Sequence, residues 1–366
     1  MSVPQHDPTR STSTVPAVPE LRLPRGVTVS VGRVSRADRG ACDVLPAAAA
    51  PGEPAPAGAL RATWGADVVA AAAHDPEAVP ATGDWVALAA WPDDRVTVEV
   101  VLPRAACLAR AQVAAGSSYR QVLAANVDVV AVVEGMSPDP DPGRLERMLA
   151  LAWASGATPV VVLTKADLVA RPELLVAEVA ELAPGCTVLP VASLAGEGVH
   201  DVRTLVDGGR TMALLGASGV GKSSLLNALV GTTAMRTREL RTDGKGRHTT
   251  VTRELHPLPG GGAVIDTPGL RSVGLAGTEQ LQDVFAEVGA LAAGCRFADC
   301  SHAVEPGCAV LAAVDAGELT ARRLDSYRRL QREAEYQASR TDARLRAQRA
   351  ARWRQVHLQA RTRSRP

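Results

Sequence analysis

The chain has 366 residues, of which 46% are hydrophobic and 22% are charged, and its formal net charge is +1. These values are ordinary for a globular protein and exclude a chain too polar to bury a core, and the length predicts two or three domains. No apolar run reaches the roughly 18 residues of a membrane span, and the N-terminus lacks the apolar segment of a secretory signal, so we expect a cytoplasmic protein.

The N-terminal third is predicted to form a disordered extension followed by a small all-β domain. Residues 1–25 are rich in Pro, Ser and Thr, a composition typical of disorder. In residues 26–112, short apolar segments such as VTVSVGRV, DWVALAA and RVTVEVVLP are separated by loops rich in Gly, Pro and Ala, which predicts β-strands. An oligonucleotide-binding (OB) barrel is one candidate among several, because strands alone do not select it.

Residues 113–275 show a different pattern, in which apolar strands alternate with amphipathic helices. The strands are VDVVAVVEG, TPVVVLTKADL and TVLPVAS, and the helices are PGRLERMLALAWASG and RPELLVAEVAELAPG. This alternation predicts an α/β domain built on a parallel sheet with helices on both faces.

A phosphate-binding loop (P-loop) lies inside this α/β region. GASGVGKSS at 216–224 fits G-x-x-x-x-G-K-[ST], between an apolar strand at 211–215 and a helix that follows it. In such a loop the glycines let backbone N–H groups surround the phosphates, the lysine reaches the outer phosphates, and the hydroxyl ligates Mg²⁺. We therefore expect nucleotide to bind at Gly216, Ala217, Ser218, Gly219, Val220, Gly221, Lys222, Ser223 and Ser224.

Two segments before the P-loop resemble the guanine-recognition elements of GTPases. VLTKAD at 162–167 is similar to N-K-x-D, in which Asp167 would accept two hydrogen bonds from guanine and Lys165 would pack over the base. Thr164 stands where Asn is usual, which removes one expected contact, and a helix N-cap is the alternative interpretation of Asp167. PVASLAGEG at 190–198 is similar to the S-A-x element and adds Ser193 and Leu194.

Two further elements follow the P-loop. IDTPG at 265–269 fits D-x-x-G, in which Asp266 would hold Mg²⁺ through water and the Gly269 amide would meet the γ-phosphate. GKGRHTTVTREL at 244–255 offers Thr249 and Thr250 as alternative hydroxyl ligands for Mg²⁺. Base recognition thus precedes phosphate recognition along the chain, an order that resembles the circularly permuted GTPases.

Residues 276–366 are predicted to form a zinc-binding helical domain with a basic C-terminal helix. Cys295, Cys300, His302 and Cys308 give the spacing C-x4-C-x-H-x5-C, which can close one tetrahedral Zn²⁺ site. Four protein ligands leave no open position, so we expect a structural metal. From Leu319 onward arginines far outnumber acidic residues, and an RNA-phosphate surface and a solvated helix face both fit that density.

From about Val27 to about Leu358 the chain resembles the ribosome small-subunit-dependent GTPase A family. The segments that carry the resemblance are RQVLAANVD at 120–128, GRHTTVTREL at 246–255, the Cys and His spacing, and RWRQVH at 352–357. The resemblance implies an OB barrel, a permuted G domain and a zinc-containing helical domain. It also implies GTP hydrolysis that is slow alone and faster on the small (30S) ribosomal subunit, whose late maturation the family assists through rRNA binding.

The residue that orients the attacking water is not supplied by the D-x-x-G element, because the next residue is Leu270. The resemblance assigns this role to His248, and an exposed or rRNA-contacting histidine is the alternative. Two other functions stay open: a GTP-regulated RNA-binding adaptor in which hydrolysis is incidental, and an ATP-using P-loop enzyme, which Asp167 disfavours. Nothing in the sequence demands more than a monomer.

Overall fold

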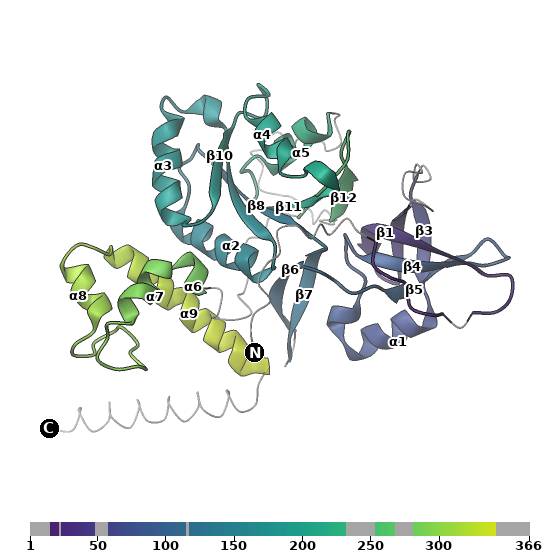
Figure 1. Cartoon of the computed structure of the whole chain (residues 1–366), viewed down its shortest axis with the longest axis horizontal. Coiled ribbons are helices and arrows are strands. Elements are labelled where there is room, and N and C mark those ends of the chain that lie inside the picture. The colour runs from purple at the N-terminus through teal and green to yellow at the C-terminus, as the bar shows by residue number, and fades with distance from the viewer. Residues whose placement is uncertain are drawn as a thin grey trace, which may run out of the picture. The chain divides into compact units, whose positions relative to one another are not determined.

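The structure, a computed structural model, describes residues 15–21, 23–47, 58–114, 117–231, 253–267 and 281–341 (Figure 1). The chain divides into two compact units. The first contains residues 1–109 and 122–272, and the second contains residues 110–121 and 273–366. The domain boundaries expected at residues 25, 112 and 275 stay predictions.

The first unit begins with a closed barrel whose strand order is β1-β2-β3-β5-β4. Its elements are β1 (Thr28–Asp38), β2 (Ala41–Pro46), β3 (Leu60–Trp64), α1 (Ala66–His74), the 3₁₀ turn η1 (Pro76–Ala78), β4 (Trp85–Ala90) and β5 (Val96–Val101). Neighbouring strands are antiparallel except β3 and β5, which are parallel, and β4 closes the barrel against β1. This is the OB arrangement, so the structure selects the barrel that the strand pattern alone left open.

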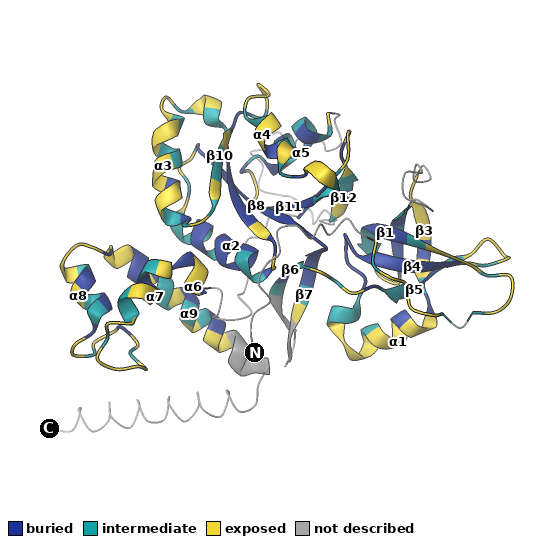
Figure 2. Ribbon diagram, in the orientation of Figure 1, coloured by how far each residue is buried: buried dark blue, intermediate teal, exposed yellow. Residues whose placement is uncertain are grey.

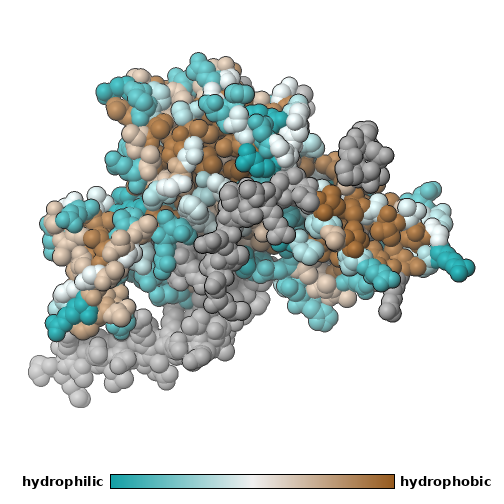
Figure 3. Space-filling model, in the orientation of Figure 1, coloured by the Kyte–Doolittle hydropathy of each residue, from teal (hydrophilic) through white to brown (hydrophobic). Residues whose placement is uncertain are grey.

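Period-two alternation along the strands fills the barrel with aliphatic side chains. Val34, Val44, Val86, Leu88 and Val98 form its buried core. A fully buried side chain of this kind contributes about 1.5–3 kcal/mol relative to an exposed one. In the space-filling view, apolar residues also gather on the outside over the barrel strands (Figure 3).

The barrel is followed by a six-stranded sheet of order β10-β9-β8-β11-β13-β12. The strands are β8 (Val129–Gly135), β9 (Thr158–Thr164), β10 (Thr187–Val191), β11 (Thr211–Leu215), β12 (Glu254–Pro257) and β13 (Ala263–Asp266). All neighbours are parallel except β12, which is antiparallel to β13 at the edge. The helices between the strands are α2 (Pro142–Ala154), α3 (Pro172–Leu182), α4 (Val199–Thr204) and α5 (Lys222–Val230).

The central strands are buried on both faces, as the apolar runs predict. Every residue of β8 and β11 is buried, whereas α3 shows an exposed outer side (Figure 2). Valine and leucine side chains of β8, β9, β11 and α5 pack into one core cluster. The predicted parallel sheet is therefore confirmed, and the P-loop strand β11 lies between β8 and β13.

Between the barrel and the sheet the chain forms a hairpin of β6 (Cys107–Ala114) and β7 (Ser117–Ala125). The second unit is helical beyond this hairpin, with α6 (Leu281–Val284), α7 (Ala286–Ala292), α8 (Ala309–Asp315) and α9 (Ala321–Thr341). Within the described ranges, no helix combines the length and apolar character required to cross a membrane.

Candidate functional site

The P-loop connects the end of β11 to the start of α5, and two of its glycines are required by close contacts. A Cβ on Gly216 would lie 2.5 Å from the Val133 carbonyl oxygen. Gly221 has φ +101°, and a Cβ there would lie 2.9 Å from Thr164 Oγ1. Only glycine fits both positions, because it combines a small volume with access to positive φ. The loop therefore brings backbone N–H groups to the N-terminus of α5, where an anion is stabilised.

Lys222 and Asp266 are two buried side chains of opposite charge in this site. Lys222 Nζ donates to the carbonyl oxygens of Gly216 and Ala217, at 2.8 Å each. Burial lowers the pKa of Lys222, and the carboxylates of Asp266 and Glu134 oppose that shift. Burial likewise raises the pKa of Asp266, opposed by Lys222 and His256.

One oxygen of Asp266 indicates a missing partner. Oδ1 is buried and has no hydrogen-bond partner among the described residues. A buried carboxylate oxygen normally has a partner, and carboxylate oxygens suit Mg²⁺. The residues present therefore fit a phosphate-bound Mg²⁺ at the carboxyl end of β13.

The T-K-x-D element lies at the carboxyl end of β9, two strands from the P-loop strand. The Thr164 hydroxyl is within hydrogen-bonding distance of the carbonyl oxygens of Val220 in the P-loop and, at 3.2 Å, of Glu134. From the sequence we expected only the loss of one contact at Thr164. In the structure, this hydroxyl connects the T-K-x-D element to the P-loop. Lys165, at φ 60°, donates to the Ser137 carbonyl at 2.9 Å, and Asp167 is exposed.

The S-A-x element follows the adjacent strand β10. Ser193 Oγ is buried and, within the part of the chain that the structure describes, has no hydrogen-bond partner. The next side chain, Leu194, is 87% exposed. An unpartnered hydroxyl and an exposed leucine at the carboxyl edge of the sheet are features of a ligand-binding loop.

His248, Thr249, Thr250 and Gly269 lie outside the described residues, as does Leu270. The described chain resumes at Arg253, directly before β12, and it ends the D-x-x-G strand at Thr267. The assigned roles of these four residues therefore stay predictions.

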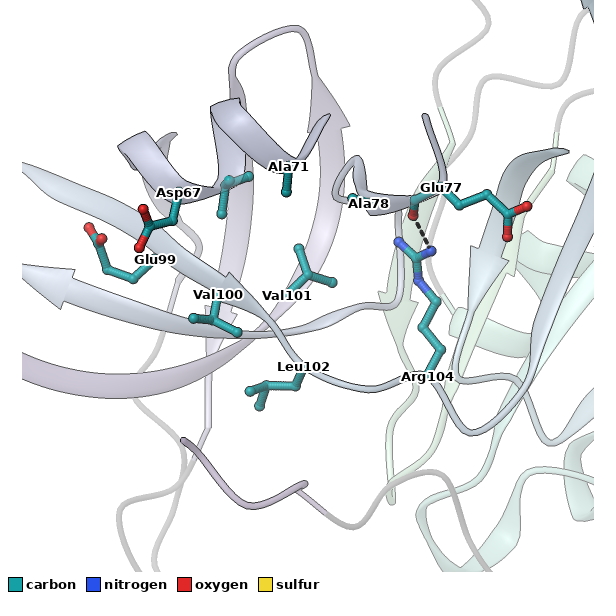
Figure 4. Close-up of a pocket in the computed structure, with 10 residues that line it drawn as sticks. Asp67, Ala71, Glu77, Ala78, Glu99, Val100, Val101, Leu102 and Arg104 are labelled. Atoms are coloured by element: carbon teal, nitrogen blue, oxygen red, sulfur yellow. Dashed lines mark hydrogen bonds between the residues drawn. The ribbon is translucent and has the colours of Figure 1, made fainter. Parts of the chain in front are cut away.

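Sequence reasoning missed the ion pair beside this site. Glu134 is fully buried at the end of β8, and Arg144 of α2 donates to both of its carboxylate oxygens, at 2.7 and 2.6 Å. The sequence did contain one indication of this ion pair, because Glu134 is the one charged residue in the apolar run VVAVVEG and would need a partner when buried. The pocket drawn in Figure 4 is separate from the site, because it lies between α1 and β5 of the barrel and contains none of the predicted nucleotide residues.

In the second unit, the four predicted metal ligands come together. The ligand atoms of Cys295, Cys300, His302 and Cys308 all lie within 4.8 Å of one another. Cys295 Sγ is 3.8 Å from Cys308 Sγ, and His302 Nδ1 is 3.6 Å from Cys295 Sγ and 3.5 Å from Cys308 Sγ. Tetrahedral Zn²⁺ with ordinary bond lengths requires about 3.8 Å between two sulfurs and about 3.6 Å between sulfur and nitrogen. The cluster therefore has the dimensions of a zinc site.

Helix α9 packs against the loop that carries these ligands. Arg328 donates to the His302 carbonyl oxygen, and the Tyr327 ring lies 6.4 Å from the His302 ring. Arg323 lies 4.3 Å above the Phe285 ring and pairs with Glu287 at 2.6 Å. The ligand cluster and the helices around it thus form one packed structure.

Comparisons with known proteins agree with this arrangement. A family model described as RsgA GTPase matches residues 101–276. A protein of Streptomyces avermitilis named small ribosomal subunit biogenesis GTPase RsgA is 52% identical over 307 residues, 82% of this chain and 79% of the relative. A protein of Lactiplantibacillus plantarum named small ribosomal subunit biogenesis GTPase RsgA 2 is 44% identical over 266 residues, 72% of this chain and 75% of the relative.

Solved structures match over most of the chain. YjeQ from Thermotoga maritima matches with a TM-score of 0.60 and 26% identity, covering 84% of this chain and 99% of that one. YloQ, described as a circularly permuted GTPase, matches in fold with a TM-score of 0.57 and 24% identity, covering 86% and 98%. The expected barrel and permuted α/β domain are thereby confirmed. Extensive identity to relatives, together with the P-loop geometry, shows that the chain belongs to the RsgA GTPase family.

Proposed function

We propose that this protein assists the maturation of the small ribosomal subunit in the cytoplasm and hydrolyses GTP while bound to that subunit and its rRNA. Family membership makes it a GTPase that uses GTP and Mg²⁺. The observation that carries the site assignment is the buried, unpartnered Asp266 oxygen beside Lys222 at the end of the P-loop. Single-turnover GTP hydrolysis with and without purified small subunits tests the proposal.

Each described residue has a distinct task in this proposal. Backbone N–H groups of 216–223 surround the phosphates, and Lys222 exchanges its two carbonyl partners for phosphate oxygens. Ser223 would hold Mg²⁺ through its hydroxyl and Asp266 would hold it through water, and the metal would supply positive charge to the phosphates. Thr164 keeps the base element in register with the P-loop through Val220.

Guanine selection is assigned to Asp167. We expect Asp167→Asn to weaken GTP binding by at least about 10²-fold and to favour xanthine nucleotides, because the amide cannot accept both hydrogen bonds from guanine N1 and N2. The measurement is titration of a fluorescent nucleotide with GTP, XTP and ATP as competitors. Asp201→Asn, on the exposed surface of α4, is the matched control. Unchanged preference for GTP in Asp167→Asn would show that the base binds elsewhere.

The cysteine and histidine cluster is proposed to hold one structural Zn²⁺. Three thiolates and one imidazole are a common zinc ligand set, and they leave no position for substrate. The separations among the ligand atoms of Cys295, His302 and Cys308 match the tetrahedral values, and the Cys300 thiol lies within 4.8 Å of these atoms. The metal would link the loop at 295–308 to α8 and thereby stabilise the second unit.

We expect purified protein to contain about one Zn per chain. Cys300→Ser should lose most of that zinc and lose hydrogen-exchange protection across residues 281–336, while nucleotide affinity persists because the nucleotide site belongs to the first unit. Cys186→Ser is the control, since Cys186 is a half-buried thiol outside the cluster. Full protection in a zinc-free Cys300→Ser protein would refute a structural metal.

A GTP-regulated RNA-binding adaptor is the second candidate function. The arginine-rich composition after Leu319 favours it as much as it favours the first. Under this alternative, nucleotide would change the affinity for subunits while the subunits leave turnover unchanged. The hydrolysis experiment therefore separates the two functions.

A further inference from the structure

A short loop of the barrel, Ala81–Asp84, contacts the sheet of the same unit; we call it the barrel loop. Thr82 is 2% exposed, and its hydroxyl donates to the Arg253 carbonyl oxygen at 3.3 Å across 171 residues of sequence. The Thr82 carbonyl accepts a hydrogen bond from the Ala125 N–H at 2.9 Å. Thr82 therefore binds both the end of β7 and the residue that leads into β12.

Gly83 lies close to both the end of β7 and the sheet strand β13. Its φ is +93°, and a Cβ there would lie 2.2 Å from the Ala125 carbonyl oxygen and 2.9 Å from Ile265 Cδ1. Ile265 is the residue before Asp266 in β13. Positive φ and this spacing both require glycine, so the barrel touches the strand that carries the Mg²⁺ carboxylate.

The barrel loop is held rigidly on the barrel side. Gly83 N–H donates to the Val34 carbonyl and Val34 N–H donates to the Asp84 carbonyl, both at 2.8 Å. Arg104 donates through Nε and Nη2 to the fully buried Asp84 carboxylate, at 2.7 Å each. Arg104 also reaches the Glu77 carbonyl at 2.6 Å (Figure 4). A buried, paired carboxylate of this kind costs much to disrupt, so the loop keeps its shape.

On the side of the sheet, the barrel loop contacts the segment Asn126–Asp128, which follows β7 and which we call the NVD segment. Arg33 of β1 is 8% exposed, and it donates to the carbonyl oxygens of Asn126 at 2.9 Å and Gly83 at 3.3 Å. Asn126 Nδ2 also donates to the Gly83 carbonyl, at 3.1 Å. Asp128 accepts the Thr211 N–H at 2.7 Å at the start of the P-loop strand. Through these contacts the NVD segment joins the barrel to the sheet.

The barrel loop thus reaches both strands that border the predicted hydrolytic residues. Arg253 follows directly on residues 232–252, which contain His248, Thr249 and Thr250. Ile265 precedes Asp266, after which the chain continues to Gly269. The P-loop, by contrast, is built on β11 and α5. A change at the barrel loop should therefore affect the hydrolytic residues more than the nucleotide affinity.

We propose that Thr82 and Gly83 are positioning residues for GTP hydrolysis, which hold β12 and β13 against the barrel so that the residues that continue from these two strands keep the positions that subunit-stimulated turnover requires. The inference rests on the proposed function, because it names residues that position the site for subunit-stimulated hydrolysis. Contacts at both strands limit where the residues that orient water and Mg²⁺ can lie, and small misplacements of such residues lower the rate strongly. Among the described residues, the hydrogen bonds of Thr82 and Gly83 involve none of the predicted nucleotide-binding residues.

The first test compares Thr82→Val with Thr82→Ser in the full chain. Valine removes the hydroxyl at nearly constant volume, whereas serine keeps it. We expect Thr82→Val to lower subunit-stimulated kcat about threefold to tenfold, the effect of one neutral hydrogen bond, with KM and fluorescent-nucleotide Kd unchanged. Thr82→Ser should behave as the parent protein. Melting curves of the variants establish that both are folded.

The second test compares Gly83→Ala with Gly40→Ala. Both glycines have positive φ, at +93° and +75°, but nothing lies within 4 Å of a Cβ at Gly40. The pair therefore separates backbone strain from the clash with Ala125 and Ile265. We expect Gly83→Ala to lose more than about tenfold in stimulated kcat and Gly40→Ala to lose little. If Gly83→Ala does not fold, the comparison of Thr82→Val with Thr82→Ser tests the proposal.

The outcomes separate the inference from the proposed function. A parent protein whose turnover does not rise with subunits contradicts both. A stimulated parent with equal stimulation in Thr82→Val overturns the inference alone. Equal losses in Thr82→Val and Thr82→Ser, or a loss of nucleotide affinity that matches the loss of kcat, also overturn it.

Discussion

Lys222→Ala is expected to weaken GTP binding by about 10²- to 10³-fold, because a buried charge that meets phosphate is removed and its partners are left unpaired. Lys222 is 7% exposed, and its ammonium group lies against two P-loop carbonyls. Since the substitution leaves the loop glycines in place, we expect the fold to persist. Fluorescent-nucleotide titration and calorimetry measure the affinity.

Arg95→Ala is the matched control for this loss of positive charge. Arg95 lies in the barrel and pairs at 3.1 Å with Asp93, and both side chains are more than half exposed. An exposed pair contributes about 0–1 kcal/mol, so the control should bind GTP as the parent does. Parental affinity in Lys222→Ala would mean that this loop does not hold the phosphates.

His248→Ala is expected to lower subunit-stimulated turnover by about 10²- to 10⁴-fold with GTP affinity nearly intact, the range for loss of a proton-handling group. Leu270 cannot orient water, and the family resemblance assigns this role to His248. Single-turnover assays at saturating subunits isolate the chemical step.

His200→Ala provides the comparison for His248→Ala. His200 is an exposed histidine of α4, outside the predicted site. If His248→Ala and His200→Ala are stimulated equally, a group of the ribosomal subunit must orient the water. An affinity loss in His248→Ala as large as its turnover loss would instead assign the histidine to binding.

The elements that sequence predicted best are those whose chemistry requires a fixed local spacing. The P-loop strand and helix, the carboxyl-edge positions of Asp167 and Asp266, and the cysteine and histidine cluster all follow from residues close together in the chain. In such segments the covalent connection itself limits where the side chains lie. The parallel strands were equally accessible, because their sequences are mostly apolar.

Contacts between distant segments could not be read from the sequence. The hydrogen bond from Thr82 to Arg253 joins residues 171 positions apart, and neither residue type identifies the other. Thr164 was interpreted by comparison with Asn, whereas its bond to Val220 depends on how two loops meet. In the barrel, the short strands β2 and β3 and the alanine-rich α1 carried too little periodicity to be placed.

We expect the small subunit to raise the rate of GTP hydrolysis by this protein. The most direct measurement is single-turnover hydrolysis of labelled GTP by the full chain, alone, with excess purified small subunits, and with large subunits as the control. We predict a rise of at least about tenfold with small subunits only, which corresponds to about 1.4 kcal/mol of additional stabilisation of the transition state. Equal rates in all three mixtures would contradict the account.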